Sequence, residues 1–341
     1  MASTAAVDIP CSDVAAEVDH FVTLGWRVVD VFPADDPRLV TLDGHGVRLL
    51  VRRGEGTAPR LMVGSGFDTS TPSPSGVRID PSGEVRPTAV LESSLSITTG
   101  SEPWHVGRAG MHYRDLVPDR QGGAVIASHI RIPIGGPVPD YPHFHEVVFQ
   151  LIFCQKGWVR LAYESQGEPF VLHAGECVIQ PPTIRHRVLE SSDDLHVVEL
   201  GFPAEHLTIA DHEFDFRSCP VDPAREWDGQ RFVRYTNDHK TWAVTAPGVE
   251  ESDTGIADAT RSRADVRELK MEPEGTHTFG VTPDRTFLMV FVLSGEVVAD
   301  LDDEWHLLGE ESAIVVPVGK AATFRAQTAA KLLVAMIDTT L

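Results

Sequence analysis

Three histidines and a glutamine near the middle of the chain have the spacing of a metal site. His143 and His145 are two residues apart, Gln150 follows five residues later, and His186 comes after a turn that contains two prolines. Neutral imidazole is the commonest protein ligand for Fe, Mn, Ni, Cu and Zn, and three imidazoles leave coordination positions open for water, oxygen or substrate. Structural zinc sites are instead closed and usually rich in cysteine. These residues therefore predict one divalent metal ion in an open, reactive site.

The elements that position these residues are predicted to be strands. Side chains alternate along a strand, so His143 and His145 point to the same face. Gln150 breaks this period of two, and we expect a bulge or turn around Glu146 to Val148 to bring it inward. His186 opens the run His-Arg-Val-Leu, which is typical of a strand that follows a turn. In a barrel, such a strand meets the first pair of histidines.

The segment from Gly136 to Glu190 resembles the two cupin motifs. The motif positions are filled here by Gly136, His143, His145, Gln150 and Gly157, and then by Gly175, Pro181 and His186. The chain departs from the motifs in one extra residue before His143, in Thr183 at a glycine position, and in Gln150, where most cupins have glutamate. The resemblance implies that His143, His145, His186 and Gln150 are the metal and catalytic residues.

The glutamine bears on the mechanism. A neutral carboxamide binds a metal weakly through its oxygen or hydrogen-bonds to a metal-bound water, and it is not a base at ordinary pH. Either the substrate arrives already ionised, or a residue outside the motif takes the proton. The segment after the predicted strand 195–201 offers His206, Asp211 and His212 as acid or base, although an exposed polar loop would have the same composition.

The second half of the chain repeats the pattern of the first barrel. Aligning Gly157 with Gly295 superposes two runs of apolar residues with the same rhythm. The positions that match the metal motif are then Val281, Pro283 and Leu288, none of which is a metal ligand. The resemblance therefore implies a mainly β protein with two cupin barrels, of the double-stranded β-helix or jelly-roll type, and only the first barrel is expected to bind metal.

A small module is expected before the barrels. An apparent helix over 13–24 is followed by strand-like runs at 26–31, 38–42 and 46–51. This order resembles one β-α-β-β-β half of a vicinal-oxygen-chelate (glyoxalase-like) domain. A complete metal site of that family needs two such halves, so we expect a structural appendage.

The predicted domains follow from these patterns. Residues 1–65 form the glyoxalase-like half module, and residues 66–100 form a linker and an irregular segment, because Gly, Ser, Thr and Pro are in excess there. Residues 101–220 form the metal-binding barrel. Residues 221–341 form the degenerate, metal-free barrel.

Composition excludes several classes of partner. Fifty acidic against 29 basic residues give a formal charge of −21, which repels nucleic acid and anionic membrane surfaces. The four cysteines contain no C-x-x-C pair, and Cys154 and Cys177 lie in apolar runs typical of core thiols. Residues 1–8 contain neither a basic segment nor an apolar stretch, so we expect no leader sequence, and no run approaches the roughly 20 apolar residues of a membrane span. We expect a cytoplasmic homodimer that binds a small molecule, without nucleic acid or membrane.

Three classes of function remain open. The first is a non-haem Fe(II) dioxygenase acting on a small chelating, enolisable or aromatic substrate. The second is a redox-neutral cyclase, isomerase or lyase that uses Zn, Ni or Mn as a Lewis acid. The third is a bicupin that binds a small molecule without catalysis. The resemblance favours the first, with Fe(II) as the metal ahead of Zn, Ni, Mn or Cu.

Overall fold

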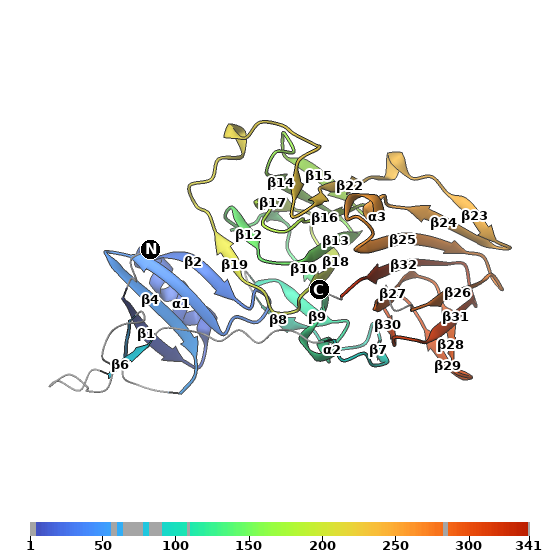
Figure 1. Ribbon diagram of the computed structural model, residues 1–341, viewed down its shortest axis with the longest axis horizontal. Coiled ribbons are helices and arrows are strands. Elements are labelled where there is room, and N and C mark those ends of the chain that lie inside the picture. The colour runs from blue at the N-terminus through green and yellow to red at the C-terminus, as the bar shows by residue number, and fades with distance from the viewer. Residues whose placement is uncertain are drawn as a thin grey trace. The chain divides into compact units, whose positions relative to one another are not determined.

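The chain is a mainly β protein, as the sequence predicts (Figure 1). The computed structural model describes residues 5–55, 60–63, 78–81, 91–107, 110–281 and 286–339. The chain folds into two compact units. The first contains residues 1–88, 141–146 and 205–214, and the second contains residues 89–140, 147–204 and 215–341. Much of the predicted linker and the predicted motif position Pro283 lie outside the described residues. The predicted domain boundaries stay predictions.

The N-terminal part of the first unit has the predicted helix and strands. Helix α1 (Val14–Thr23) begins after Asp13, whose carboxylate accepts a hydrogen bond from the backbone N–H of Ala16 and caps the helix. The strands are β1 (Ala6–Cys11), β2 (Arg27–Phe32), β3 (Leu39–Gly44) and β4 (Val47–Arg53). They lie in the order β2-β3-β4-β1, with β1 parallel to β4. Strands β5 (Arg60–Val63) and β6 (Arg78–Pro81) continue the sheet beyond β1.

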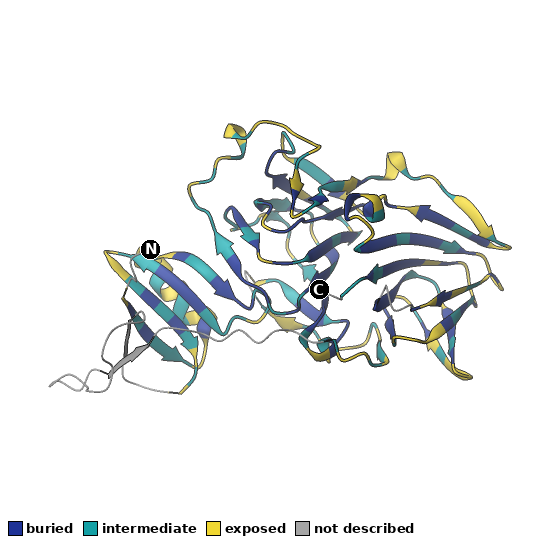
Figure 2. Ribbon diagram, viewed as in Figure 1, coloured by how far each residue is buried: buried dark blue, intermediate teal, exposed yellow. Residues whose placement is uncertain are grey.

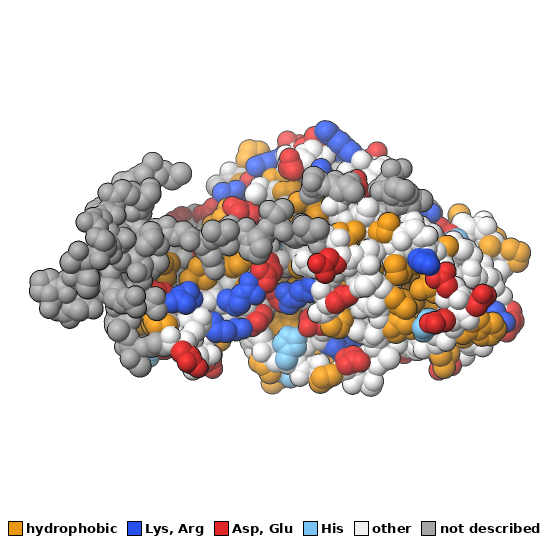
Figure 3. All heavy atoms as spheres, turned by 60° about the horizontal axis from the view of Figure 1, so that its bottom comes forward, with side chains coloured by type: hydrophobic (Ala, Val, Ile, Leu, Met, Phe, Trp, Pro, Cys, Tyr) orange, Lys and Arg blue, Asp and Glu red, His pale blue; other side chains and the backbone are white. Residues whose placement is uncertain are grey.

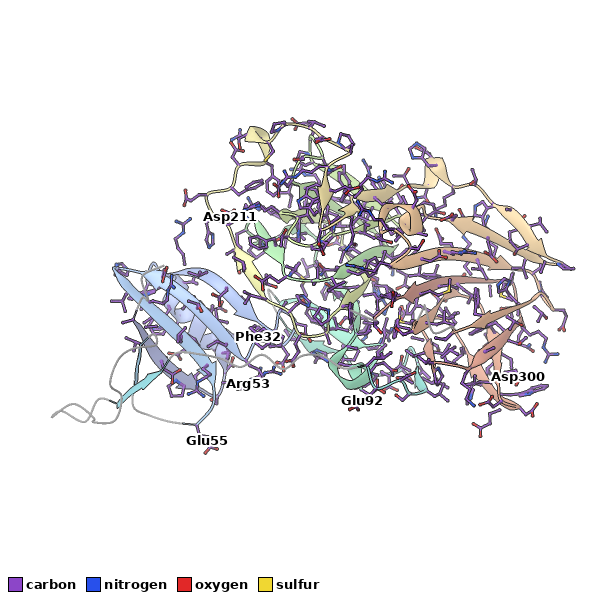
Figure 4. The ribbon with its side chains drawn as sticks, in the orientation of Figure 1. Phe32, Arg53, Glu55, Glu92, Asp211 and Asp300 are labelled. Atoms are coloured by element: carbon purple, nitrogen blue, oxygen red, sulfur yellow. The ribbon has the colours of Figure 1, made fainter. Side chains whose placement is uncertain are left out.

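The other edge of this sheet carries two strands from distant parts of the sequence. Strand β19 (Thr208–Ala210) pairs with β2, and strand β12 (His143–His145) pairs with β19. Figure 4 marks Phe32, the last residue of β2, and Asp211, which directly follows β19. The strand that carries the His-x-His motif is therefore attached by backbone hydrogen bonds to the sheet of the N-terminal segment.

The second unit contains two barrels. In the first, a seven-stranded sheet has the order β22-β16-β13-β18-β10-β9-β8. Its strands are β8 (His105–Val106), β9 (His112–Asp115), β10 (Ile126–Ile132), β13 (Phe149–Lys156), β16 (Cys177–Ile179), β18 (Leu195–Phe202) and β22 (Val233–Tyr235). Opposite it, β14 (Trp158–Tyr163) pairs with β15 (Phe170–His173) and with β17 (His186–Ser191). Strand β11 (Gly136–Pro137) pairs with the end of β17.

The second barrel repeats this arrangement. Its larger sheet has the order β23-β24-β25-β32-β27-β30-β7, and its smaller sheet has the order β26-β31-β28-β29. The strands of the larger sheet are β7 (Ser96–Thr98), β23 (Ala243–Ala246), β24 (Val249–Asp253), β25 (Ala264–Met271), β27 (Phe287–Ser294), β30 (Ala313–Val316) and β32 (Ala330–Ile337). Those of the smaller sheet are β26 (Thr276–Gly280), β28 (Val297–Leu301), β29 (Glu304–Leu308) and β31 (Ala321–Ala326).

The registers confirm the internal repeat. Phe149 pairs with Phe202 at the end of β18, and Phe287 pairs with Ile337 at the end of β32. Each barrel also contains a strand from outside its own run of sequence. Strand β7 precedes the first barrel in the sequence, yet it pairs with β30 of the second barrel. Conversely, β22 follows the first barrel and pairs with its strand β16.

Alternation along the strands separates an inner core from an inter-barrel core. Phe149, Leu151 and Phe153 on β13 pack in one cluster with Phe287, Phe291 and other residues of the second barrel. The alternate residues Ile152 and Cys154 pack with Val159 and Leu172 inside the first barrel. Figure 2 shows the resulting buried runs along the central strands. Alternate residues of β13 therefore face the barrel interior and the second barrel.

The described part of the chain also contains short elements between these strands. They are helices α2 (Arg120–Gly123) and α3 (Ile256–Ala259), the 3-10 turns η2 (Phe216–Ser218) and η3 (Asn237–His239), and strands β20 (Glu226–Trp227) and β21 (Gln230–Arg231). On the face shown in Figure 3, acidic and basic side chains are interspersed. Arg53 and Asp36 form one of the ion pairs of the first unit. Among the described residues, no helix is long and apolar enough to span a bilayer.

Candidate metal centre

Both histidines of the His-x-His motif are buried, and each has one ring nitrogen engaged by an oxygen atom. His143 Nδ1 lies 2.8 Å from the carbonyl oxygen of Tyr141, and His145 Nδ1 lies 2.7 Å from Oγ1 of Thr208 on β19. A carbonyl oxygen only accepts hydrogen bonds, so His143 carries its proton on Nδ1 and a lone pair on Nε2. The Thr208 hydroxyl can accept the corresponding bond from His145. Both rings are then ready to bind a metal through Nε2.

The third histidine has the same arrangement. His186 opens β17, is 3% exposed, and its Nδ1 lies 3.0 Å from the carbonyl oxygen of Ile184. Its ring stacks on Tyr163, with ring centroids 5.6 Å apart, because these two residues are register partners on β17 and β14. The lone pair of His186 is therefore also on Nε2.

The structure brings the three predicted histidines together. Ligand atoms of His143, His145 and His186 all lie within 4.8 Å of one another. Two backbone carbonyls select the tautomer of His143 and His186 that leaves Nε2 unprotonated, and the Thr208 hydroxyl is compatible with the same tautomer of His145. Metal-binding histidines usually have such a contact on their other ring nitrogen. The residues present therefore fit a divalent metal ion.

Gln150 occupies the first inward position of β13, as the predicted break around Glu146 to Val148 requires. Strand β12 ends at His145 and β13 begins at Phe149, so the prediction of a break is confirmed. Gln150 alternates with the inter-barrel residues Phe149 and Leu151 and so faces the interior. Its Nε2 donates a hydrogen bond to Oε1 of Glu199, whereas its own Oε1 is buried without a hydrogen-bond partner among the described residues. Whether Gln150 ligates a metal stays a prediction.

Glu199 is a site residue that the sequence interpretation missed. It lies on β18 between Val198 and Leu200, which both belong to the inter-barrel core, and therefore faces the barrel interior. Glu199 pairs with Ser128 on the neighbouring strand β10, and Ser128 is 2% exposed. The strand pattern of β18 could have marked Glu199 as an acidic residue among apolar neighbours, but nothing in the sequence relates it to Gln150.

Two further polar side chains, Tyr163 on β14 of the opposite sheet and Gln180 after β16, lie near Glu199. The hydroxyl of Tyr163 accepts a hydrogen bond of 2.7 Å from Nε2 of Gln180. Burial raises the pKa of Tyr163 well above its ordinary value, the bond from Gln180 opposes this rise, and the charge of Glu199 adds to it. Tyr163 is therefore a neutral hydrogen-bonding group throughout the physiological pH range.

The candidate acid and base residues after β18 have different surroundings. His206 is 6% exposed, and its ring lies 5.2 Å from that of His145. His212 Nε2 donates a bond of 2.6 Å to the carbonyl oxygen of Val28, so this nitrogen serves the N-terminal sheet. The backbone N–H of Asp211 donates to the carbonyl oxygen of Pro142. Of the three, His206 has its ring beside a predicted ligand.

In the second barrel, the positions that correspond to the motif and are described hold apolar side chains. Val281 and Leu288 are 5% and 1% exposed and belong to an apolar cluster with Val290 and Phe324. The larger sheet of this barrel therefore buries apolar residues where the first barrel has Gln150.

A second group of potential ligands lies in the second unit, outside the cupin motifs. Ligand atoms of His129, His196 and Glu311 lie within 4.8 Å of one another, but Arg114 already supplies the cation. Its guanidinium donates to Nδ1 of His129 and to Glu311, both at 2.6 Å. His129 must then carry its proton on Nε2, which lies 3.1 Å from Nδ1 of His196. This tautomer has no lone pair on Nε2 for a metal.

Comparisons with known proteins show the fold. No family model matches the sequence, and no curated protein matches it. Among solved structures, the protein Ylba from E. coli is similar with a TM-score of 0.55 and 12% identity, over 74% of this chain and 95% of that chain. A salicylate 1,2-dioxygenase from Pseudaminobacter salicylatoxidans has a TM-score of 0.52 and 13% identity, over 75% and 87%.

Oxalate decarboxylase from Bacillus subtilis is also similar, with a TM-score of 0.52 and 9% identity, over 74% of this chain and 78% of that chain. At these identities the likeness concerns the fold. The predicted two-barrel cupin fold is confirmed, whereas no comparison supports the glyoxalase-like assignment of the N-terminal segment, which stays a prediction.

Proposed function

We propose that this chain is a metal-dependent cupin enzyme, and that it is an Fe(II) dioxygenase of a small chelating substrate. The observation that carries the proposal is the shared orientation of the three buried imidazoles. His143, His145 and His186 each direct Nδ1 to an oxygen atom and leave Nε2 for a metal. Three neutral ligands leave the charge of a divalent ion uncompensated, which favours an anionic bidentate substrate such as an enolate, a catecholate or an aromatic hydroxy acid.

The chain's own residues would give this site its selectivity. His143, His145 and His186 would hold Fe(II), which would supply the redox chemistry for a reaction of a chelating substrate with dioxygen. Tyr163, whose hydroxyl accepts a hydrogen bond from Gln180, keeps its proton and could donate a hydrogen bond to a substrate oxygen. Leu161 and Val197 belong to the same buried apolar cluster as Tyr163, and such surroundings would limit the access of water. A fold shared with a salicylate 1,2-dioxygenase is compatible with this chemistry.

The first experiment measures the metal. We expect protein purified without added metal to contain close to one equivalent of a divalent metal by elemental analysis, and His143→Ala and His186→Ala to lose it. His239→Ala, which removes an exposed histidine of η3, is the matched control and should retain it. Metal retained undiminished in both site variants would overturn the proposed centre.

The second experiment measures oxygen. Fe(II)-loaded protein should consume dioxygen when aromatic hydroxy acids such as salicylate and gentisate, or a β-diketone, are added, and His186→Ala should not. Turnover that continues without oxygen would instead favour the redox-neutral cyclase, isomerase or lyase. Substrate binding without turnover under either condition would favour a binding bicupin.

A further inference from the structure

We infer that Glu199 is the carboxylate of this metal centre, moved from the motif position on β13 to the neighbouring strand β18. The inference rests on the proposed metal function. In the cupin motif the fourth position usually holds a glutamate, and here it holds Gln150. The geometry suggests that the negative charge was relocated one strand away rather than lost.

Strand register places the two side chains beside each other on the inner face. Gln150 pairs with Gly201, and Glu199 pairs with Ile152, so the two residues are diagonal neighbours on paired strands. Diagonal pairs in an antiparallel sheet are within reach of long side chains. Both residues alternate with members of the inter-barrel core and therefore point into the first barrel.

Their chemistry is complementary in only one orientation. The Gln150 amide donates to Glu199 through Nε2, because a flipped amide would set its oxygen against the carboxylate. A glutamate at position 150 would set a second negative charge beside Glu199 and would remove the N–H that Gln150 donates. Gln150 is thus a positioning residue that holds the carboxylate, and within the described part of the chain its Oε1 is buried without a hydrogen-bond partner.

The charge of Glu199 also acts on Tyr163, which lies next to the predicted ligand His186. It contributes to the raised pKa of the Tyr163 hydroxyl, and the Tyr163 ring stacks on His186. Glu199, Gln150 and Tyr163 therefore share one polar end of the barrel interior. A carboxylate placed there offsets part of the charge that three neutral imidazoles leave on a divalent ion.

A charge swap tests this inference with Co(II) as the probe. The dissociation constant for Co(II) is measured by anaerobic absorbance titration of the full chain. We expect Glu199→Gln to weaken binding about 10- to 100-fold, the range found for residues that support metal ligands. Gln150→Glu combined with Glu199→Gln restores one carboxylate to the pair and should recover most of the loss. Glu168→Gln, which removes an exposed carboxylate, should bind as the wild type does.

The outcomes separate this inference from the proposed function. Wild-type affinity in Glu199→Gln, or a double variant that binds no better than Glu199→Gln, would overturn the assignment of Glu199 while the metal centre stands. A wild-type chain that binds no Co(II), or His186→Ala that binds it equally well, would overturn both. If Glu199→Gln fails to fold, the double variant decides whether the carboxylate of this pair supports Co(II) binding, because it keeps one carboxylate and one carboxamide at these two positions.

Discussion

Thr208 links the N-terminal sheet to a predicted metal ligand, and its replacement tests that link. Its Oγ1 lies 2.7 Å from Nδ1 of His145, and its backbone pairs with His145 on one side and with Val31 of β2 on the other. Thr208→Val keeps the shape and the strand propensity of the side chain but removes the hydroxyl. Since Thr208 is 1% exposed, water cannot readily replace the lost acceptor.

The expected magnitude follows from this burial. A buried N–H that loses its acceptor costs about 1–3 kcal/mol. His145 can avoid the cost by moving its proton to Nε2, the atom proposed to bind the metal. Either response weakens metal binding, so we expect the dissociation constant for Co(II) to rise about 10- to 100-fold in Thr208→Val. Thr208→Ser retains the hydroxyl and should stay close to the wild type.

The assay is the same anaerobic Co(II) titration, with thermal unfolding measured alongside. Thr41→Val is the matched control, because Thr41 is another buried threonine in the same sheet; it should leave the dissociation constant unchanged. Unaltered Co(II) affinity in Thr208→Val would refute the reasoning. So would equal losses in Thr208→Val and Thr208→Ser, since the hydroxyl would then not be the group that matters.

Two predictions concern stability. Burial, aided by the charge of Arg114, lowers the pKa of His129 from 6.5 to about 3. Below pH 6.5, His129 therefore binds a proton in the unfolded chain but stays neutral in the folded chain. The free energy of unfolding falls as the pH drops from 6.5 towards 3, by about 1.4 kcal/mol per pH unit. Urea unfolding at several pH values should show a shallower loss in His129→Gln, and an unchanged slope would contradict this account. Gly295 has φ +82°, and a Cβ there would lie 2.3 Å from the carbonyl oxygen of Ala329. Gly295→Ala should lower the free energy of unfolding by at least about 2 kcal/mol, whereas Gly309→Ala, with no atom within 4 Å of the added Cβ, should be nearly neutral.

Much of the fold could be predicted because its signals are local. The helix predicted over 13–24 is α1, and the strand predicted over 195–201 is β18, each within a few positions. The internal repeat was visible because equivalent glycines begin equivalent turns, as Gly157 and Gly295 do with φ of +79° and +82°. The exchange of β7 and β22 between the barrels could not be predicted, because short strands pair wherever an open sheet edge is available.

The sequence by itself determined which side chains are candidates for the metal, since His143, His145, Gln150 and His186 stand at motif spacing. Only the tertiary structure decided how they are supported. Thr208 is 63 residues from His145, and Glu199 is 49 residues from Gln150. Such neighbours meet because strands distant along the chain become adjacent in a sheet, and a spacing in sequence carries no record of that pairing. The same reason explains why a glutamine that looks like a lost carboxylate in the sequence lies beside a carboxylate in the folded barrel.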